Sequence, residues 1–307
     1  MSDVNRGPMR IASFNVQNMR LRASGLDGAR DGDEACGPAA LDRADRRLTA
    51  QVIAAARADV VALQEVFDRA TLDHFHDRVL RRTGARPYPW RLCRPGNDGR
   101  GLDVALLSRR PVRDWQSHAA LRPADLGLSP PPGVSPDLPV FRRDCLEVQL
   151  AALTLYVCHF KAPWPDPQAA HPVRALEAEA VRRLIGARFA DPARARWLVV
   201  GDFNEPAPGT ADSALAPLAA ISVDLMARLP AAARWSFHDP QTGYAQLDGM
   251  RASPALARRW PHARPELVRA GLGREVSAFA GPRLAGVGRH RPHASDHAAL
   301  VIDFPGL

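Results

Sequence analysis

Several features that often classify a protein at once are missing from this sequence of 307 residues. Its four cysteines contain no CxxC pair, which argues against a structural zinc site or a redox motif. No stretch approaches the roughly 18 consecutive apolar residues of a membrane span, so we expect no membrane-spanning segment. Residues 1–10 hold no apolar run before a cleavage site, and we therefore expect a cytoplasmic protein.

Lysine is nearly absent as well, because Lys161 is the only one and arginine carries almost all of the positive charge. A net charge of +8 favours a partner rich in phosphate. An arginine bias beside abundant alanine and proline can, however, follow from nucleotide composition alone. Since no contiguous basic run is present, the charge is weak evidence for a nucleic-acid surface.

Internal repeats and low-complexity linkers are missing too. We therefore expect one domain over residues 9–304, after a flexible N-terminus at residues 1–8. The hydrophobic fraction of 46% and the charged fraction of 24% are near globular averages. The chain can thus bury a core, and no obligate protein partner is implied.

The spacing of apolar residues predicts a mixture of strands and helices. Residues 20–41 are rich in glycine, aspartate and alanine and read as a long loop, and the proline-dense stretch 121–139 should be irregular. In the third expected helix, we place Arg174 and Glu177 on the solvent side. The expected helices are 43–57, 71–82 and 173–189, and the expected strands are 9–17, 59–65, 89–93, 104–108, 145–150, 153–159, 197–200, 246–252 and 298–304.

Polar residues stand where three of these strands end. Asn15 follows the first strand, Glu65 the second, and Asp202 with Asn204 follows the strand at 197–200. A single acid in such a place is most often a helix cap or a turn former. Three at once favour a site for a hard divalent ion, because Mg²⁺ and Mn²⁺ bind carboxylate and amide oxygens.

Histidines with nearby acids form a second pattern. Asp296 and His297 stand directly before the last expected strand, and His159 ends another. Asp248 lies in an apolar stretch, where an unpaired acid is costly to bury. A buried acid next to a histidine fixes the tautomer of the imidazole and raises its basicity. The pattern matters only together with the strand-end residues, since an Asp–His pair alone is weak evidence.

Taken in order, these motifs resemble the endonuclease/exonuclease/phosphatase superfamily from about residue 9 to residue 304. Each block is short, but their order and spacing together are specific. The resemblance implies an α/β fold: a four-layer α/β/β/α sandwich of two packed, mostly antiparallel sheets flanked by helices, with the site where strand ends from both sheets meet. The blocks are Ser13-Phe14-Asn15, Leu63-Gln64-Glu65-Val66, Val104-Ala105-Leu106-Leu107-Ser108-Arg109, His159-Phe160-Lys161, Gly201-Asp202-Phe203-Asn204, Leu247-Asp248 and Ser295-Asp296-His297.

The resemblance implies a metal centre in this protein. Asn15 and Glu65 match the residues that hold the principal ion, which would be Mg²⁺ or Mn²⁺, with one or two ions bound. Asp296 lies close by and is able to join through water.

The resemblance also implies which residues act on the phosphoryl group. Asp202 and Asn204 match the pair that positions the nucleophile and stabilises the transition state. His297 matches the histidine that touches the scissile phosphate, with Asp248 as its carboxylate partner. His159 matches a second histidine that faces the phosphate.

Three further assignments are looser. Asp103 falls near an acid that supports the second histidine in some members, and Arg143 falls near an arginine that contacts the phosphate. Lys161 is a third candidate for the phosphate. The alternatives are a solvated turn for the acid and exposed basic residues for the other two.

Two departures from the family pattern stand out. Gly249 follows Asp248 where an aromatic is usual, a change that can loosen the packing under the site. The mid-chain tyrosine of abasic-site endonucleases has no clear counterpart among Tyr88, Tyr156 and Tyr244, which lowers the case for a repair nuclease.

These residues predict a metal-dependent phosphoester hydrolase, foremost a phosphodiesterase or nuclease, in which water attacks phosphorus in line. A phosphomonoesterase or a sphingomyelinase-like phospholipid phosphodiesterase is the alternative within this class. A binding protein that lost catalysis is a further alternative, although all main positions carry competent residues. The expected loop at 20–41 follows Asn15 directly, so we expect it to shape substrate access.

Overall fold

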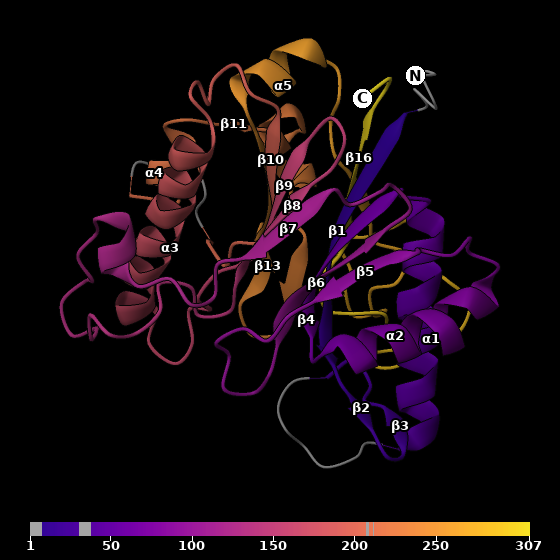
Figure 1. Ribbon diagram of the computed structural model, residues 1–307. Coiled ribbons are helices and arrows are strands. Elements are labelled where there is room, and N and C mark those ends of the chain that lie inside the picture. Colours follow the sequence, from indigo (N-terminus) through magenta and orange to yellow (C-terminus); the bar gives the residue numbers. More distant parts are fainter. Residues whose placement is uncertain (1–7, 31–37, 207–208, 211) are drawn as a thin grey trace.

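The computed structural model describes residues 8–30, 38–206, 209–210 and 212–307. Two six-stranded sheets pack face to face, and helices cover their outer sides (Figure 1). Helices α1 (Ala39–Ala56) and α2 (Arg69–Arg78) lie on one side, and α3 (Pro167–Arg188) lies on the other. This arrangement confirms the predicted four-layer sandwich.

Each sheet holds one parallel pair of strands among antiparallel ones. In the first sheet β1 (Met9–Met19) is parallel to β4 (Val60–Val66), and in the second β9 (Thr154–His159) is parallel to β10 (Trp197–Asp202). Helices α1 and α3 make these two crossovers, which parallel neighbours require. The strand orders are β15-β16-β1-β4-β6-β5 and β11-β14-β10-β9-β8-β7, with β5 (Trp90–Cys93), β6 (Asp103–Ser108), β7 (Asp114–Ser117), β8 (Cys145–Gln149), β11 (Val223–Asp224), β14 (Asp248–Ala252), β15 (Glu266–Val268) and β16 (Ala299–Phe304).

Apolar side chains fill the space between the four layers. The layer between the sheets includes Ile11, Val60, Val157 and Val200, all fully buried. Separate apolar clusters pack α1 and α2 on the first sheet and α3 on the second. Since burial of one such side chain stabilises a fold by roughly 1.5–3 kcal/mol, these layers hold the strand ends in place.

Local chemistry sets where the helices begin. Asp68 caps α2 by accepting the N–H of Thr71 at 2.6 Å. Asp166 caps α3 in the same way, and Pro167 occupies its first position. Helix α3 therefore begins at Pro167 rather than at residue 173, and Pro172 lies inside it.

The segment 20–41 is not one long loop, and this prediction was wrong. Strands β2 (Leu21–Arg22) and β3 (Gly25–Leu26) form a small hairpin, and α1 already begins at Ala39. Two paired residues per strand are too few to show a strand period in sequence. Residues 31–37 lie outside the described residues, as do residues 1–7 of the expected flexible N-terminus.

Other short elements escaped prediction for the same reason. The stretch 121–139 is irregular as predicted, apart from one 3₁₀ turn. The helix expected at 71–82 is divided into α2 and a 3₁₀ turn at Leu80–Thr83. The unpredicted elements are β2, β3, β7, β11, β12 (Phe237–Asp239), β13 (Gly243–Ala245), β15, α4 (Ala216–Ala219), α5 (Pro254–Arg259) and 3₁₀ turns at Pro123–Leu126, Met226–Arg228 and Ala231–Ala233.

Across the part of the chain that the structure describes, no helix has the length and apolar character to cross a membrane.

Candidate active site

Three adjacent strands of the second sheet place three candidate residues side by side. Asp202, the last residue of β10, pairs in register with His159 at the end of β9 and with Asp248 at the start of β14. All three side chains are buried. The register of the sheet therefore gathers two carboxylates and an imidazole at one edge.

Glycine and asparagine shape the chain around Asp202. Gly201 has a φ of +147°, and a Cβ there would lie 1.9 Å from the carbonyl oxygen of Cys158 on β9, so only glycine fits. Asn204 adopts a left-handed φ of 50°, which asparagine tolerates better than most residues. Its N–H donates to Asp202 Oδ1 at 2.9 Å, and its Nδ2 donates to the Phe160 carbonyl at 3.1 Å. The Asp202 carboxylate is thus held in one orientation.

Phe203 fills the space beside Gly249. A Cβ at Gly249 would lie 2.6 Å from the Phe203 ring. The same ring packs on Phe160, with ring centroids 5.4 Å apart, and both rings are buried. The missing aromatic after Asp248 therefore leaves no loose packing at this point, contrary to our expectation.

A bulge in β4 directs Glu65 toward the site. The pairing of β4 with β6 shifts between Gln64 and Val66, so Glu65 is the extra residue, and its φ is 68°. Glu65 Oε2 accepts the Asn18 N–H at 2.8 Å, and Oε1 accepts Asn15 Nδ2 at 3.1 Å. A positive φ is unfavourable for glutamate, and backbone strain of this kind clusters at functional sites.

Asn15 joins the two sheets. Its Nδ2 donates to Glu65 Oε1 of the first sheet and also to Asp202 Oδ2 of the second, each at 3.1 Å. Ser295 Oγ lies 2.8 Å from the Asn15 carbonyl and accepts the His297 N–H at 3.1 Å. Residues from the two sheets and from the segment before β16 therefore meet at one place.

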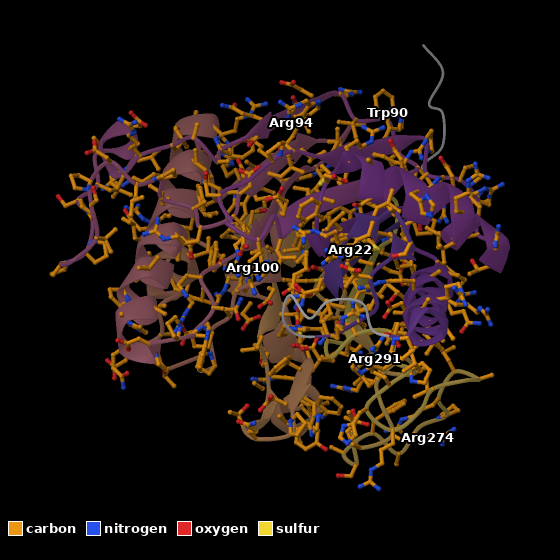
Figure 2. All side chains as sticks on the ribbon, turned by 90° about the horizontal axis from the view of Figure 1, so that it is seen from below. Arg22, Trp90, Arg94, Arg100, Arg274 and Arg291 are labelled. Atoms are coloured by element: carbon orange, nitrogen blue, oxygen red, sulfur yellow. The ribbon has the colours of Figure 1, made fainter. Side chains whose placement is uncertain are left out.

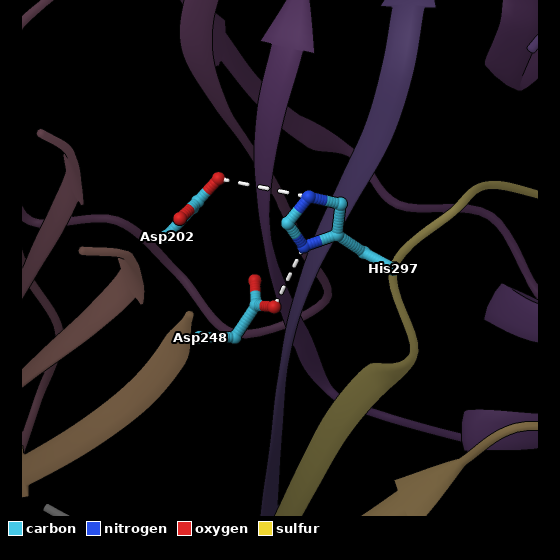
Figure 3. A group of neighbouring side chains, drawn as sticks. All are labelled: Asp202, Asp248 and His297. Carbon is cyan, nitrogen blue, oxygen red and sulfur yellow. Dashed lines mark hydrogen bonds and ion pairs between the residues drawn. The ribbon is translucent and has the colours of Figure 1, made fainter. Parts of the chain in front are cut away.

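The imidazole of His297 lies between two carboxylates (Figure 3). Its Nδ1 is 2.7 Å from Asp248 Oδ2, and its Nε2 is 3.8 Å from Asp202 Oδ2. Burial alone would lower the pKa of His297, but the charges of Asp248, Asp296 and Asp202 outweigh burial and raise this pKa well above the ordinary value. The ring is therefore protonated at neutral pH, and both nitrogens carry a proton.

Asp202 and His159 favour their neutral forms. Burial raises the pKa of Asp202 to about 7, while the charge of His297 opposes this rise. Burial also lowers the pKa of His159 well below the ordinary value, and the positive charge of Arg143 adds to that effect. His159 Nε2 lies 3.6 Å from Asp202 Oδ2. The site thus contains one charged imidazole, one neutral imidazole and a carboxyl group that exchanges protons near neutral pH.

The donor set around Glu65 fits a hard divalent ion. Glu65 and Asn15 offer carboxylate and amide oxygens, and the strained bulge fixes the Glu65 carboxylate beside Asn15. Asp296 is linked to this place through Ser295, whose Oγ lies 3.2 Å from Asp296 Oδ1 and 2.8 Å from the Asn15 carbonyl. The cluster in Figure 3 also brings three donor atoms within 4.8 Å of one another. In that cluster His297 Nδ1 already lies 2.7 Å from Asp248 Oδ2, so the imidazole would offer only its Nε2 to an ion.

The charged groups of Arg143 and Lys161 contact nearby backbone carbonyls, and that of Arg143 also contacts one acid. Arg143 Nη1 donates to the Phe160 carbonyl at 3.1 Å, and its Nε lies 3.0 Å from Asp98 Oδ2. Lys161 Nζ donates to two carbonyls of its own loop, those of Ala162 and Trp164. Both residues lie close to the segment that carries His159, and these contacts occupy part of the donors that each could offer to a phosphate.

Asp103 lies at the start of β6, on the same sheet edge as Glu65. Its Oδ1 accepts the Gly96 N–H at 2.8 Å, and burial raises its pKa to about 7. His159 Nδ1 is buried and has no hydrogen-bond partner among the described residues. The structure therefore does not form the expected support of His159 by Asp103.

Glu177 is a residue near the site that the sequence reasoning missed. We expected Glu177 and Arg174 to face solvent, but both are buried, so this prediction was wrong. Glu177 accepts the N–H of Arg142 at 2.9 Å and the N–H of Lys161 at 2.7 Å. Burial raises its pKa to about 7. A glutamate in an amphipathic helix gives no sequence signal for such a role, because solvated glutamates follow the same spacing.

A two-sheet sandwich with buried carboxylates, amides and imidazoles at its strand ends has the architecture of metal-dependent phosphoester hydrolases. The model of the Endonuclease/Exonuclease/phosphatase family matches residues 12–297, and the chain belongs to this family. A search among curated proteins gave no match. Members of the family are phosphoester-hydrolysing enzymes that typically depend on a divalent metal, and this protein is such an enzyme.

Solved structures share the fold over almost the whole chain. A humanized D. rerio TDP2 has a TM-score of 0.59 at 17% identity and covers 97% of this chain and 98% of its own. SmcL has a TM-score of 0.61 at 18% identity, over 97% of this chain and 99% of its own. An endonuclease/exonuclease/phosphatase family protein from Leptotrichia buccalis has a TM-score of 0.58 at 13% identity, over 96% and 98%. At these identities the likeness shows the fold alone.

Proposed function

We propose that the protein is a phosphodiesterase that works with Mg²⁺ or Mn²⁺ and cleaves its substrate by in-line attack of water. The observation that carries the proposal is the geometry of the site: the buried imidazole of His297 lies between Asp248 and Asp202, and Asn15 links Asp202 to Glu65. The three nearby aspartates raise the pKa of His297, which favours its charged form. Positive charge at this position matches the negative charge that grows on phosphoryl oxygens during hydrolysis.

Asn15 and Glu65 would hold the metal ion, and Asp296 would join through water. When bound, a divalent ion neutralises charge on the phosphoryl group and on the leaving oxygen. The Asn15 amide also contacts Asp202, so the metal site and the proton acceptor share one side chain.

Asp202 orients a water molecule and accepts its proton as the water attacks phosphorus. Asn204 and Asn15 each donate a hydrogen bond to this carboxylate and keep it pointed into the site. Because the pKa of Asp202 is about 7, the carboxylate is a stronger base than an ordinary aspartate and is still partly ionised at neutral pH.

The two histidines bind the non-bridging oxygens in different protonation states. His297 donates its Nε2–H to one oxygen, while Asp248 keeps the proton on Nδ1. His159 is neutral and donates from one nitrogen only. Charge on the phosphoryl group is thus stabilised by a cation on one side and by a neutral hydrogen bond on the other.

Nucleic acid is the substrate class that we place first. Figure 2, which views the protein from below, labels Arg22, Arg100 and Arg291. Each of them pairs with aspartate: Arg22 with Asp27, Arg100 with Asp98, and Arg291 with Asp42 and Asp45. A polymer would have to draw such guanidinium groups from their aspartates to its further phosphates, and binding of this kind weakens steeply as salt rises. The activity of a phosphodiesterase that acts on small molecules would depend only weakly on salt concentration.

The test compares bis(4-nitrophenyl) phosphate, 4-nitrophenyl phosphate, single-stranded DNA, RNA and sphingomyelin vesicles, each with Mg²⁺ and with Mn²⁺. Asp202→Ala and His297→Ala should each lower diester turnover by about a hundredfold or more. Asp137→Ala removes an exposed carboxylate elsewhere and should keep the wild-type rate. Diester turnover that survives both site substitutions would refute the mechanism, and turnover of the monoester alone would reject the diesterase.

A further inference from the structure

A second cavity lies apart from the catalytic cluster and shares no residue with it. Its volume is about 720 Å³. Its walls come from α1 between Arg43 and Ala54, from α2 and the following turn between His74 and Thr83, and from the hairpin at Ser24–Leu26. These elements lie together at the lower right of Figure 1, on the outer side of the first sheet.

Four arginine side chains give the lining of the cavity a positive charge. Arg43 and Arg47 line it from α1, and Arg78 and Arg82 line it from α2 and the turn that follows; all four are exposed. None of the four guanidinium groups makes an ion pair or hydrogen bond within the described part of the chain, and no described acid lines the cavity. Like charges around one hollow repel each other, and an anion inside it would remove that cost.

The lining also contains apolar side chains and an unpaired hydrogen-bond acceptor. Leu26, Ala54, Val79 and Leu284 add apolar surface. Gln51 lines the cavity as well, and its Oε1 is buried with no hydrogen-bond partner among the described residues. Because an unsatisfied buried acceptor is unfavourable, a ligand with a hydrogen-bond donor beside its anionic group would fit best.

Arg46 fixes the inner wall before any ligand binds. Its side chain is fully buried and donates four hydrogen bonds of 2.5–2.7 Å, which tie α1 to the chain after Asn15. A wall that is already ordered reduces the entropy that binding must offset. The acceptors are the carbonyl oxygens of Val16, Gln17, Asp27 and Gly28.

We propose that this cavity is a second ligand site, which takes a small organic phosphate with an apolar body and a hydrogen-bond donor, as in a nucleoside monophosphate. Cavities of roughly 300–1,000 Å³ suit small ligands, and the volume of this cavity lies within that range. Guanidinium groups bind phosphate oxygens through paired N–H donors. The proposal is independent of the proposed function, because it needs neither metal nor turnover.

The experiment is calorimetric titration with AMP, inorganic phosphate and adenosine, in the presence of a chelator. The protein carries His297→Gln, so that the catalytic site lacks its charged phosphate donor. AMP should bind with one-to-one stoichiometry and more tightly than phosphate, and adenosine should not bind measurably. Arg43→Gln with Arg78→Gln should weaken AMP at least about tenfold, since each loses a charge-assisted hydrogen bond.

The matched control is Arg57→Gln with Arg86→Gln, which removes the same charge from exposed positions outside the cavity. Thermal unfolding of both double variants should match that of the parent. Equal weakening in the two double variants would overturn the proposal, because it would show general attraction to a basic protein. Absence of AMP binding to the parent, or binding of a DNA oligonucleotide without binding of AMP, would overturn it as well.

Discussion

Replacing Asp248 with asparagine tests the charged state of His297 most directly. The change keeps the shape of the side chain and removes one negative charge, 2.7 Å from His297 Nδ1. Burial favours the neutral imidazole, and Asp248 is the largest of the charges that oppose it. In Asp248→Asn the pKa of His297 should therefore fall, and the neutral ring would no longer present positive charge to the phosphate.

The expected size of the effect follows from the geometry. Two charges about 4 Å apart attract each other by roughly 4 kcal/mol at an effective dielectric constant of about 20. If the transition state uses most of this energy, turnover falls by up to about a thousandfold, since about 1.4 kcal/mol corresponds to tenfold. Loss of one preorganised donor in other enzymes gives roughly 100-fold to 1,000-fold, so we expect a decrease in that range.

The assay is steady-state hydrolysis of a chromogenic phosphodiester over a series of pH values. The alkaline limb of the profile should move to lower pH in Asp248→Asn, because the imidazole loses its proton more readily. Asp303→Asn is the matched control: it removes one carboxylate that pairs with Arg10, outside the site. Asp248→Asn combined with His297→Gln should be no slower than His297→Gln alone. A wild-type rate and an unmoved alkaline limb in Asp248→Asn would refute the reasoning.

Three further predictions concern stability and metal. Gly201→Ala should lower the free energy of unfolding by roughly 3 kcal/mol, since its Cβ meets the Cys158 backbone, whereas Gly186→Ala in α3 has free space and should be neutral or stabilising in denaturant melts. Glu177 has a folded pKa raised from 4.5 to about 7, so its contribution to stability is full below pH 4.5 and is lost as pH rises through about 7. Relative to Glu177→Gln, wild-type stability should therefore fall by about 3 kcal/mol across this window, and parallel pH curves would contradict the assignment. Glu65→Gln should weaken binding of Mn²⁺ in calorimetry, and chelation should abolish wild-type turnover reversibly; full activity without divalent metal would exclude the metal site.

The order of polar residues along the sequence predicted which side chains meet. Asp202 ends β10 and His159 ends β9, and neighbouring strands of one sheet end at a shared edge, so the proximity of these two follows from the pattern. Asn15 does not end its strand, because β1 continues to Met19. The orientation of Glu65 does not follow, because a bulge with a positive φ on a glutamate leaves no mark in the sequence. The direct contact between Asn15 and Asp202 also depends on how two sheets pack, which local periodicity cannot describe.

The sequence did not predict the buried polar contacts between residues that are far apart along the chain. Glu177 looked like a solvated residue of an amphipathic helix, because its partners are backbone groups at Arg142 and Lys161, far away in sequence. Motif position predicted that Asp103 supports His159 and that Arg143 contacts the phosphate. In the structure Asp103 Oδ1 accepts the Gly96 N–H, and Arg143 contacts the Phe160 carbonyl and Asp98. The position of a motif predicts the strand on which a residue lies. The hydrogen-bond partner of its side chain depends on loops, which have no hydrophobic periodicity to predict them from.

Because Asn15 links residues of both sheets, catalytic activity would depend on the correct packing of the two sheets against each other. Residues 9–108 and 266–304 form the first sheet, and residues 114–252 form the second. Glu65 belongs to one half and Asp202 to the other, and Asn15 donates a hydrogen bond to each of them. Two fragments cut between β6 and β7 would each lack part of the chemistry, and recovery of turnover after mixing them would measure complementation between the sheets.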